Sequence, residues 1–417
     1  MEKIYHEEIL TFALDFGKKL LESGYEVLKT QRTMEILCKN FGATDTEFFV
    51  IPSEINTTVK FNDDTYTQMR EITKGGTNLF IIEKLNDLSR RICKEKLSLY
   101  ESKELFNKVI LQKPYGQLIN SLGAGLGTGG FSVFFGGTLA DGICAFVIGF
   151  LAFYIYNFFI EHFSKIAVAF LVSAIDGIIA VLLYKLGLCN NLDMVMIGAI
   201  MTIIPGMAFG NSVKDLLVGD TISGILTFTN AILISVAIAS GLASVIAMFL
   251  NNFINITTAV TSDFARVISG MVGTIGFGLL FSLHPKKLPT IAIGGAVVTF
   301  VLVIAEQIVP SGRFFVFFTE MIASMFAEIL SEILARVQKA PTAIFLLPFL
   351  IPLVPGGGLY RTMFNLVKGD YTLFNVYFSS TIESGLGIAV GMVFAGIFFR
   401  IIYYCYAQIK KRFTEKK

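Results

Sequence analysis

Carboxyl side chains within or beside long apolar stretches of the sequence include Asp141, Asp176, Glu320, Glu328 and Glu383, of which the first four are the candidates for function. A charge inside a bilayer is costly, and intramembrane acids are usually functional. Burial makes a carboxyl easier to protonate, so such a group can load and release protons near neutral pH. We therefore expect these four candidates to couple protons, Asp176 and Glu328 foremost, whereas Asp141 is expected at a solvated outer end of a span.

A second group of polar residues follows a break in an apolar segment. Pro205-Gly206 interrupts the segment, and Asn211, Lys214 and Asp215 come next at neighbouring helical positions. A lysine can attract a carboxylate and an aspartate can attract an ammonium group, which suits a zwitterionic substrate. A solvated helix end explains the same residues equally well, so both interpretations stay open.

The break recurs 150 residues later, where Pro355-Gly356 matches Pro205-Gly206. The same spacing pairs Leu216 with Leu366, Gly219-Asp220 with Gly369-Asp370, Gly123 with Gly273, and Phe131 with Phe281. Proline removes an amide donor, and freed backbone groups in a bilayer are tolerated where they are buried or line a wet cavity. Half-helix N-termini can then receive an anionic group. The second copy adds Thr362 and Asn365 as less charged candidate substrate contacts.

The composition is that of a membrane protein. Hydrophobic residues make up 54% and charged residues 16% of the chain, whereas soluble domains carry about 25% charge. The net charge of +2 gives no indication of nucleic-acid binding. A bilayer core takes about 20 apolar residues per helix, and the sequence predicts ten spans, at 116–136, 138–160, 165–187, 192–210, 221–250, 263–283, 288–309, 313–335, 341–360 and 372–404. The fourth and ninth contain the two breaks, so we expect them to be re-entrant or unwound.

The distribution of charge divides the chain into three predicted parts. Residues 1–114 hold 17 of the 34 Lys+Arg and 18 of the 32 Asp+Glu, and we expect them to form a small cytosolic α+β domain. Residues 115–255 and 256–417 are two predicted membrane repeats of five spans, the second with a basic cytosolic C-terminus. An odd number of spans makes the second repeat insert upside down.

The basic residues after position 114 predict the topology. With the N-terminus inside, 12 of them fall on the inner side and 5 on the outer side, the outer ones being Lys185, Arg266, Arg313, Arg361 and Lys368. Because inner loops are enriched in Lys and Arg, both termini are expected in the cytosol of a multi-pass cell-membrane protein.

The N-terminal part alternates between helical and strand patterns. Helices are predicted at 7–21, 25–41, 78–96 and 102–111, and strands at 46–61, with a break near 52–54, and at 65–72. No nucleophile–base pair or metal-ligand cluster stands out, so we expect no enzyme activity, no cofactor and no metal. Gly125-x-Gly127-x-x-Gly130 has the letters of a dinucleotide fingerprint, but its segment is apolar and helical, so close helix packing is the expected use.

These motifs together resemble the threonine/serine exporter family over almost the whole chain. The matching elements are Glu22-Ser23-Gly24, the stretch from Phe135 to Asp141, Ile204-Pro205-Gly206 with Asn211, Lys214-Asp215 and Gly219-Asp220, and in the second half Glu332, Ala335-Arg336, Pro341 and 351–356. Lys214 stands where the family more often has arginine. The chain resembles the fused form, in which both halves of split members lie in one polypeptide.

The resemblance implies export of small hydroxy amino acids such as threonine and serine, driven by an ion gradient rather than by ATP. We expect a proton-coupled secondary transporter that alternates access around the Pro205 and Pro355 breaks. A dicarboxylate exporter, which the split succinate-exporter-type relatives imply, and a membrane-embedded enzyme using the N-terminal domain are the alternatives. The expected partners are a small amino acid or dicarboxylate, protons and the lipid bilayer, with no nucleic acid; homo-oligomerisation is left open.

Overall fold

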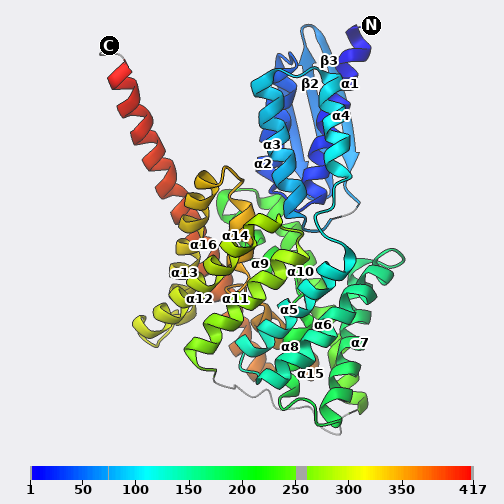
Figure 1. Ribbon diagram of the computed structural model, residues 1–417, viewed down its shortest axis with the longest axis vertical. Coiled ribbons are helices and arrows are strands. Elements are labelled where there is room, and N and C mark those ends of the chain that lie inside the picture. The colour runs from blue at the N-terminus through cyan, green and yellow to red at the C-terminus, as the bar shows by residue number, and fades with distance from the viewer. Residues whose placement is uncertain (1, 74, 250–260, 415–417) are drawn as a thin grey trace. The chain divides into compact units, whose positions relative to one another are not determined.

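The computed structural model describes residues 2–73, 75–249 and 261–414 (Figure 1). The chain forms two compact units. The first comprises Met1–Asn120, Leu279–Leu288 and Leu334–Phe345, and the second Ser121–Gly278, Pro289–Ile333 and Leu346–Lys417. The predicted junction of the repeats at 255–256 and the last basic residues, Lys416 and Lys417, lie outside the described residues.

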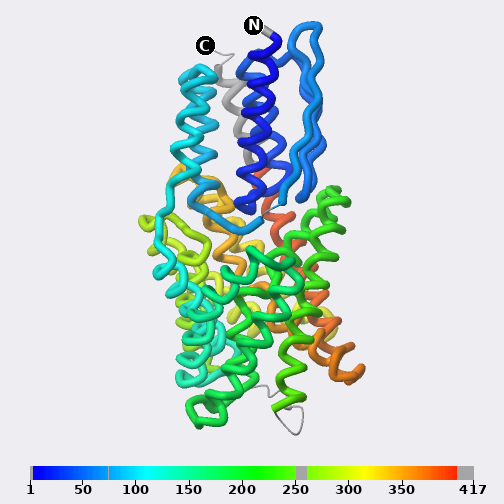
Figure 2. The backbone as a smooth tube through the Cα atoms, turned by 90° about the vertical axis from the view of Figure 1, so that its right-hand side faces the viewer, coloured from blue at the N-terminus to red at the C-terminus, as the bar shows by residue number. Residues whose placement is uncertain are grey.

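The first unit contains an antiparallel sheet in the order β1-β2-β3, and its helices lie on one face of that sheet (Figures 1 and 2). The elements are α1 (Glu2–Glu22), α2 (Val27–Asn40), β1 (Asp45–Ile51), β2 (Glu54–Phe61), β3 (Asp64–Glu71), α3 (Leu79–Glu95) and α4 (Leu99–Ile110). The predicted small α+β arrangement with three strands is confirmed.

The alternation of side chains along β2 explains how the sheet binds its helices. Ile55, Thr57, Val59 and Phe61 are buried, and the residues between them are not. Because successive side chains of a strand point to opposite faces, all four contact the helical layer. A two-residue turn joins β2 to β3, and Asn62 adopts a φ of 53° there, which asparagine tolerates.

A partly buried ion pair completes the first unit. Lys287, only 7% exposed, donates to Glu83 of α3 at 2.7 Å, and its ammonium lies 5.5 Å from the centre of the Phe345 ring. Nearby, the Leu79 amide donates to the Phe281 carbonyl at 2.9 Å, and Phe80 stacks on His284. The short segment around 281–287 is therefore tied to α3.

The remaining helices are α5 (Gln117–Phe134), α6 (Leu139–Ile160), α7 (Lys165–Lys185), α8 (Leu192–Ile200), α9 (Gly206–Val218), α10 (Thr221–Phe249), α11 (Asp263–Leu280), the 3-10 turn η1 (Pro285–Lys287), α12 (Leu288–Ile308), α13 (Phe315–Val337), α14 (Ala343–Leu350), α15 (Gly356–Lys368) and α16 (Tyr371–Thr414). Within the described residues, six helical segments are long and apolar enough to cross a membrane: 139–160, 165–185, 221–249, 263–280, 285–308 and 371–401. These correspond to six of the ten predicted spans, and the chain is a membrane protein.

The other four predicted spans have two different structures. Those at 192–210 and 341–360 are each divided at the Pro-Gly break, into α8 and α9 and into α14 and α15, as the prolines predicted. Those at 116–136 and 313–335 are the continuous helices α5, which is rich in glycine, and α13, which carries acidic residues. The count of ten spans stays a prediction.

The helix order repeats once along the chain. α9 and α15 begin and end 150 residues apart, and α5 and α11 begin and end 146 apart, since 263 − 117 and 280 − 134 are both 146. The sequence match of Gly123 with Gly273 is therefore wrong by one turn, and Gly127 is the counterpart of Gly273. The cause is the longer link between α11 and α12, which shifts the spacing in later helices.

Contacts between the repeats occur in matched pairs. A Cβ added at Gly130 of α5 would lie 2.7 Å from the Gly273 nitrogen, and one added at Gly276 would lie still closer to the Gly127 nitrogen. Residue numbers rise on α5 as they fall on α11, so the two helices cross antiparallel. The predicted use of Gly127 and Gly130 in close helix packing is confirmed. In the same way Gly206 contacts Val354 while Gly356 contacts Ile204, so the two breaks touch each other.

Candidate functional site

A cavity of about 420 Å³ lies at the second break, within the second unit. We call it the second-break cavity. Its walls come from α5, α11, α12, α13, α15, α16 and the break itself, and its polar side chains are Thr261, Arg266, Glu306, Glu320, Arg361, Ser380, Thr381 and Ser384. A second cavity, of about 460 Å³ between α5, α6 and α11, is lined almost entirely by apolar residues.

The start of α15 forms one wall of the second-break cavity, through Pro355, Gly357 and Gly358. The first amides of a helix have no acceptor inside the helix and carry partial positive charge. Glycine is needed here for close approach: a Cβ at Gly358 would lie 2.8 Å from the Thr381 hydroxyl, and one at Gly357 would lie 3.2 Å from the Phe135 ring. Backbone amides can therefore approach a ligand in the cavity.

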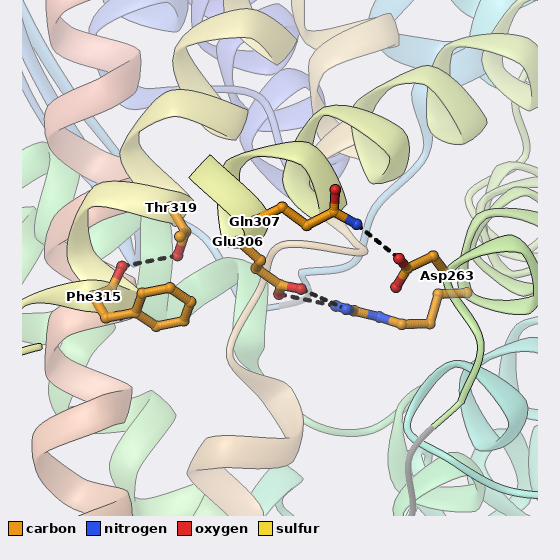
Figure 3. Close-up of polar contacts among 6 residues, drawn as sticks. Asp263, Glu306, Gln307, Phe315 and Thr319 are labelled. Atoms are coloured by element: carbon orange, nitrogen blue, oxygen red, sulfur yellow. Dashed lines mark hydrogen bonds and ion pairs between the residues drawn. The ribbon is translucent and has the colours of Figure 1, made fainter. Parts of the chain in front are cut away.

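An ion pair between α11 and α12 also lines the second-break cavity. Arg266 binds Glu306 through both of its Nη atoms, with Nη2 donating to Oε1 at 3.0 Å, and its guanidinium lies 5.4 Å from the Phe134 ring centre. Figure 3 shows Glu306 and Gln307 side by side, with Gln307 donating to Asp263 at 2.9 Å. These bonds hold Arg266 and Glu306 as a fixed, neutral pair.

Three polar atoms of the lining have no hydrogen-bond partner among the described residues. They are Oε2 of Glu320, Nε of Arg361 and Oγ of Ser384, a residue only 4% exposed. The Arg361 guanidinium lies 5.6 Å from the Tyr377 ring centre. Buried polar atoms are normally paired, so an acid, a base and a hydroxyl of the cavity are left for a ligand or water to satisfy.

Two further predicted residues support this wall. The Thr362 and Thr381 hydroxyls lie 3.2 Å apart, and Thr381 donates to the Tyr377 carbonyl at 2.7 Å. Asn365 donates to the Arg361 carbonyl at 2.8 Å. Thr362 and Asn365 thus fix α15 and its contact with α16, while Arg361 and Thr381 face the cavity.

Comparison with known families agrees with the broken, repeated membrane architecture. A family model described as "Putative threonine/serine exporter" matches residues 11–250, and one described as "Threonine/Serine exporter, ThrE" matches residues 266–398. The chain belongs to the threonine/serine exporter family. The comparison with curated proteins found no match, and neither did the comparison with solved structures.

Both halves of the family lie in one chain, but the second-break cavity is built mainly by the second half. Of the residues predicted to contact substrate, Pro355 lines the cavity and Gly356 lies between lining residues. Pro205, Gly206, Asn211, Lys214 and Asp215 belong to the first break and α9, outside the lining. Lys214 and Asp215 are both half-buried there.

The four carboxyls that were predicted to carry protons have different surroundings. Glu320 lines the second-break cavity. Asp176 is 1% exposed in α7, and neither of its oxygens has a hydrogen-bond partner among the described residues. Glu328 is buried in α13, two turns beyond Glu320.

Asp141 is held by five hydrogen bonds and is fully buried, so the expectation of a solvated carboxyl was wrong. Its Oδ1 accepts from the amides of Asn190 and Asn191 at 2.7 and 2.9 Å. Its Oδ2 accepts from the Thr138 amide and hydroxyl and from the Asn191 side chain, at 2.7, 2.8 and 3.0 Å. The carboxylate caps α6 and fastens the segment before α8.

Sequence analysis missed most of the polar lining, including Arg266, Glu306, Arg361 and Ser384. Arg266 and Arg361 were placed on the outer side, although Arg266 lies within the predicted span 263–283 and Arg361 directly follows the predicted span 341–360. Intramembrane ionisable residues are functional candidates by default, and that rule applied to the basic residues would have found them. The pairing of Arg266 with Glu306, 40 positions apart, has no signal in the sequence.

Proposed function

We propose that the protein is a proton-coupled secondary exporter of threonine and serine, and that the second-break cavity holds the substrate. The observation that carries the proposal is the pair Glu320 and Arg361, which line the same cavity and each have a buried polar atom without a hydrogen-bond partner among the described residues. With Arg266 and Glu306 neutralising each other, one negative and one positive group remain. That charge balance matches a zwitterionic amino acid.

Each group of the substrate has a complementary place in the lining. The carboxylate binds Arg361 and the free amides at the start of α15, because charge-assisted bonds and a helix N-terminus both favour an anion. The ammonium binds Glu320. The side-chain hydroxyl binds Ser384, whose own hydroxyl has no partner among the described residues.

The antiparallel crossing of α5 and α11 supports the inverted arrangement of the repeats. Repeats that insert with opposite orientation are typical of secondary transporters, and alternating access is then a rocking of one repeat against the other. We propose that Pro205, Gly206, Asn211, Lys214 and Asp215 contact the substrate in the conformation in which the two breaks exchange roles. Both termini are proposed to lie in the cytosol.

Proton movement is proposed to use the buried carboxyls Asp176 and Glu328 together with Glu320. Asp176 supports this because an ionised carboxylate without partners is costly in a bilayer, so it holds a proton when no cation is near. Asp141, also a predicted carrier, already accepts five hydrogen bonds, and we propose that it contributes by fixing α6 and the segment before α8.

Transport by proteoliposomes containing the purified full chain tests the proposal. An imposed pH gradient should drive L-threonine and L-serine, and inhibition should require both the amino and the carboxyl group of a competitor. 3-Hydroxybutyrate, which lacks the amino group, and 1-amino-2-propanol, which lacks the carboxyl group, should compete poorly. If none of the amino acids moves, the proposal fails.

A dicarboxylate exporter remains the alternative to test alongside. Of the two arginines in the lining, Arg266 is paired with Glu306, so a dianion would have Arg361 for one carboxylate and the acid Glu320, which offers no positive charge, for the other. Succinate should therefore leave threonine transport unchanged. Transport of succinate by a protein that does not transport threonine would favour the dicarboxylate function instead.

The hydroxyl contact can be tested separately by changing Ser384. Ser384→Ala should reduce the preference for threonine over 2-aminobutyrate, its analogue without the hydroxyl, by roughly tenfold, the worth of one hydrogen bond to a neutral group. Ser235→Ala is the matched control, because Ser235 is buried but already donates to the Ala231 carbonyl at 2.8 Å outside the cavity. An unchanged preference in Ser384→Ala would remove Ser384 from the site.

A further inference from the structure

We infer that Glu320 binds either a proton or the ammonium group of the substrate, so that each threonine entering the second-break cavity displaces one proton to water. The inference rests on the proposed function and gives it a coupling mechanism. It begins from the charged groups that line this cavity, which are Arg266, Glu306, Glu320 and Arg361.

Two of these four groups are already committed to each other. Arg266 and Glu306 form the bidentate pair, and Arg266 is further held against the Phe134 ring. Glu306 therefore has both oxygens occupied by a guanidinium that cannot lose its proton. Glu320 is the remaining carboxyl, and its Oε2 is buried without a hydrogen-bond partner among the described residues.

The helices around Glu320 supply few other charges. Arg266 on α11, Glu306 on α12 and Arg361 on α15 line the same cavity. On α16, a Cβ added at Gly387 would lie 3.2 Å from the Glu320 Cβ, and the titratable residue one turn earlier, Glu383, is not part of the cavity lining. The α5 wall is apolar, with Phe134 and Phe135.

A carboxylate in this position needs a cation. In the empty cavity the cation is a proton, because an ionised acid without a partner is costly away from water. When the substrate ammonium arrives, it takes the same oxygens, and the proton of the Glu320 carboxyl leaves to solvent. The two cations exclude each other, so substrate and proton cross in opposite directions.

Glu320 differs in this respect from Asp176 and Glu328. Both of those carboxyls are buried outside the cavity lining, so a substrate in the cavity cannot displace a proton from them by contact. The inference therefore assigns direct exchange to Glu320 alone. It also explains why the substrate must carry an ammonium group, since a hydroxy acid has nothing to displace the proton with.

Proton release on binding is the direct test. Saturating L-threonine is added to the purified full chain in detergent, in weak buffer, and the pH change is recorded over a series of starting pH values. The wild type should release close to one proton per bound threonine at acid pH and fewer as the pH rises. Its threonine affinity should fall about tenfold per pH unit on the acid side, by linkage.

Variants separate the role of Glu320 from general damage. Glu320→Gln should lose at least tenfold in affinity, and its residual binding should release no proton, whereas Glu320→Asp should keep the pH dependence. Glu332→Gln is the matched control, because Glu332 lies about three turns further along α13, outside the lining. It should release protons as the wild type does.

Two failures can be told apart. If the wild type binds threonine without releasing a proton at any pH, or if Glu320→Gln releases as many protons as the wild type, the inference is wrong and the proposed function survives. If the wild type binds neither threonine nor serine, the proposed function itself fails. Should Glu320→Gln not fold, the affinity profile of Glu320→Asp against pH decides, because a flat profile contradicts the inference.

Discussion

Pro205 and Pro355 have nearly the same backbone angles, with φ and ψ of −82° and 43° against −74° and 46°. Each precedes a helix of 13 residues that ends in a glycine with positive φ, at Gly219 and Gly369. The side chains differ. The first repeat has Met207, Ala208 and Asn211 where the second has Gly357, Gly358 and Arg361.

The backbone that the two copies share and the side chains that differ between them have different roles. The shared backbone makes the break and lets the two breaks contact each other. The glycines and the arginine of the second copy line the charged second-break cavity, whereas Met207, Ala208 and Asn211 of the first copy do not line it. In our proposal, an architecture that is doubled in the chain thus carries a binding site that is not doubled, which suits one asymmetric substrate.

Removing the positive charge at the second break should have the largest effect on threonine binding. Arg361→Gln should lower threonine binding and transport about 100-fold, because a charged partner of the carboxylate is lost. Asn211→Ala, the change at the equivalent position of the first break, should leave threonine binding in this conformation near the wild-type value and slow exchange. Radiolabelled threonine binding and counterflow measure the two effects.

Arg313→Gln serves as control for that pair, since Arg313 is an exposed arginine on the link between α12 and α13. It should behave as the wild type. Equal loss of binding in Asn211→Ala and Arg361→Gln would show that the two breaks contribute alike and that the asymmetry is wrong.

The links before α6 and before α12 are held by different contacts. Removing the contact of the second link should have the next largest effect, a loss of stability. The first is fastened within its repeat by Asp141, the second by Lys287 to Glu83 of α3. Lys287→Met leaves Glu83 partly buried without its cation and should destabilise the first unit by about 3 kcal/mol. Thermal unfolding in detergent measures the loss.

A double change checks that the loss comes from the pair. Lys287→Met with Glu83→Leu removes both charges, so it should recover much of the stability. A double variant as unstable as Lys287→Met would instead indicate that the Lys287 chain matters through its packing on Phe345.

The contact between the breaks predicts a smaller loss of stability when either glycine is changed, and the loss should be unequal for Gly206 and Gly356. A Cβ at Gly206 would clash with Val354, whose branched side chain is stiff, so Gly206→Ala should cost about 1–3 kcal/mol. A Cβ at Gly356 would lie 3.1 Å from both the Ile204 Cγ2 and the flexible Met201 side chain, a looser contact than that of Gly206 with Val354, so Gly356→Ala should cost less. Denaturation of both variants gives the order, and the reverse order would contradict the contact.

The smallest effect concerns Asp87, close to the Lys287–Glu83 pair. Desolvation, and then the neighbouring Glu83, raise the pKa of Asp87 above its ordinary value, against Arg90 and Lys287. A raised folded pKa favours the folded state below the unfolded value and loses that contribution as the pH rises through the folded pKa. Asp87→Asn should therefore slightly stabilise the protein at neutral pH and leave it unchanged at acid pH.

Because Asp87 is largely exposed, solvent screens this effect and the gain should be close to the detection limit of thermal unfolding. Asp63→Asn, in the turn after β2, is the control for the loss of a carboxylate elsewhere on the first unit. A loss of stability at neutral pH in Asp87→Asn would show that its carboxylate is favourably paired.

Local patterns explain how much could be predicted from the sequence. The strands of the first unit were predicted because Ile55, Thr57, Val59 and Phe61 alternate with polar residues, and the breaks because proline cannot continue a helix. The family followed from motifs around the same breaks. These signals are all short in range.

The charged cavity could not be predicted in the same way. Arg266 and Glu306 lie on different helices, and their pairing depends on how α11 and α12 pack. Arg361 was placed on the outer side by the count of basic residues. Its position beside a cavity depends on where α15 starts after the break, which that count does not contain. The sequence therefore led to Lys214 and Asp215 of the first break, whereas the cavity lies at the second.

A structure of the protein with bound L-threonine is the decisive test of the proposed site. We expect one threonine in the second-break cavity, its ammonium at Glu320, its carboxylate at Arg361 and the Gly357 and Gly358 amides, and its hydroxyl at Ser384. Threonine bound at Lys214 and Asp215, with the second-break cavity holding only water, would contradict it.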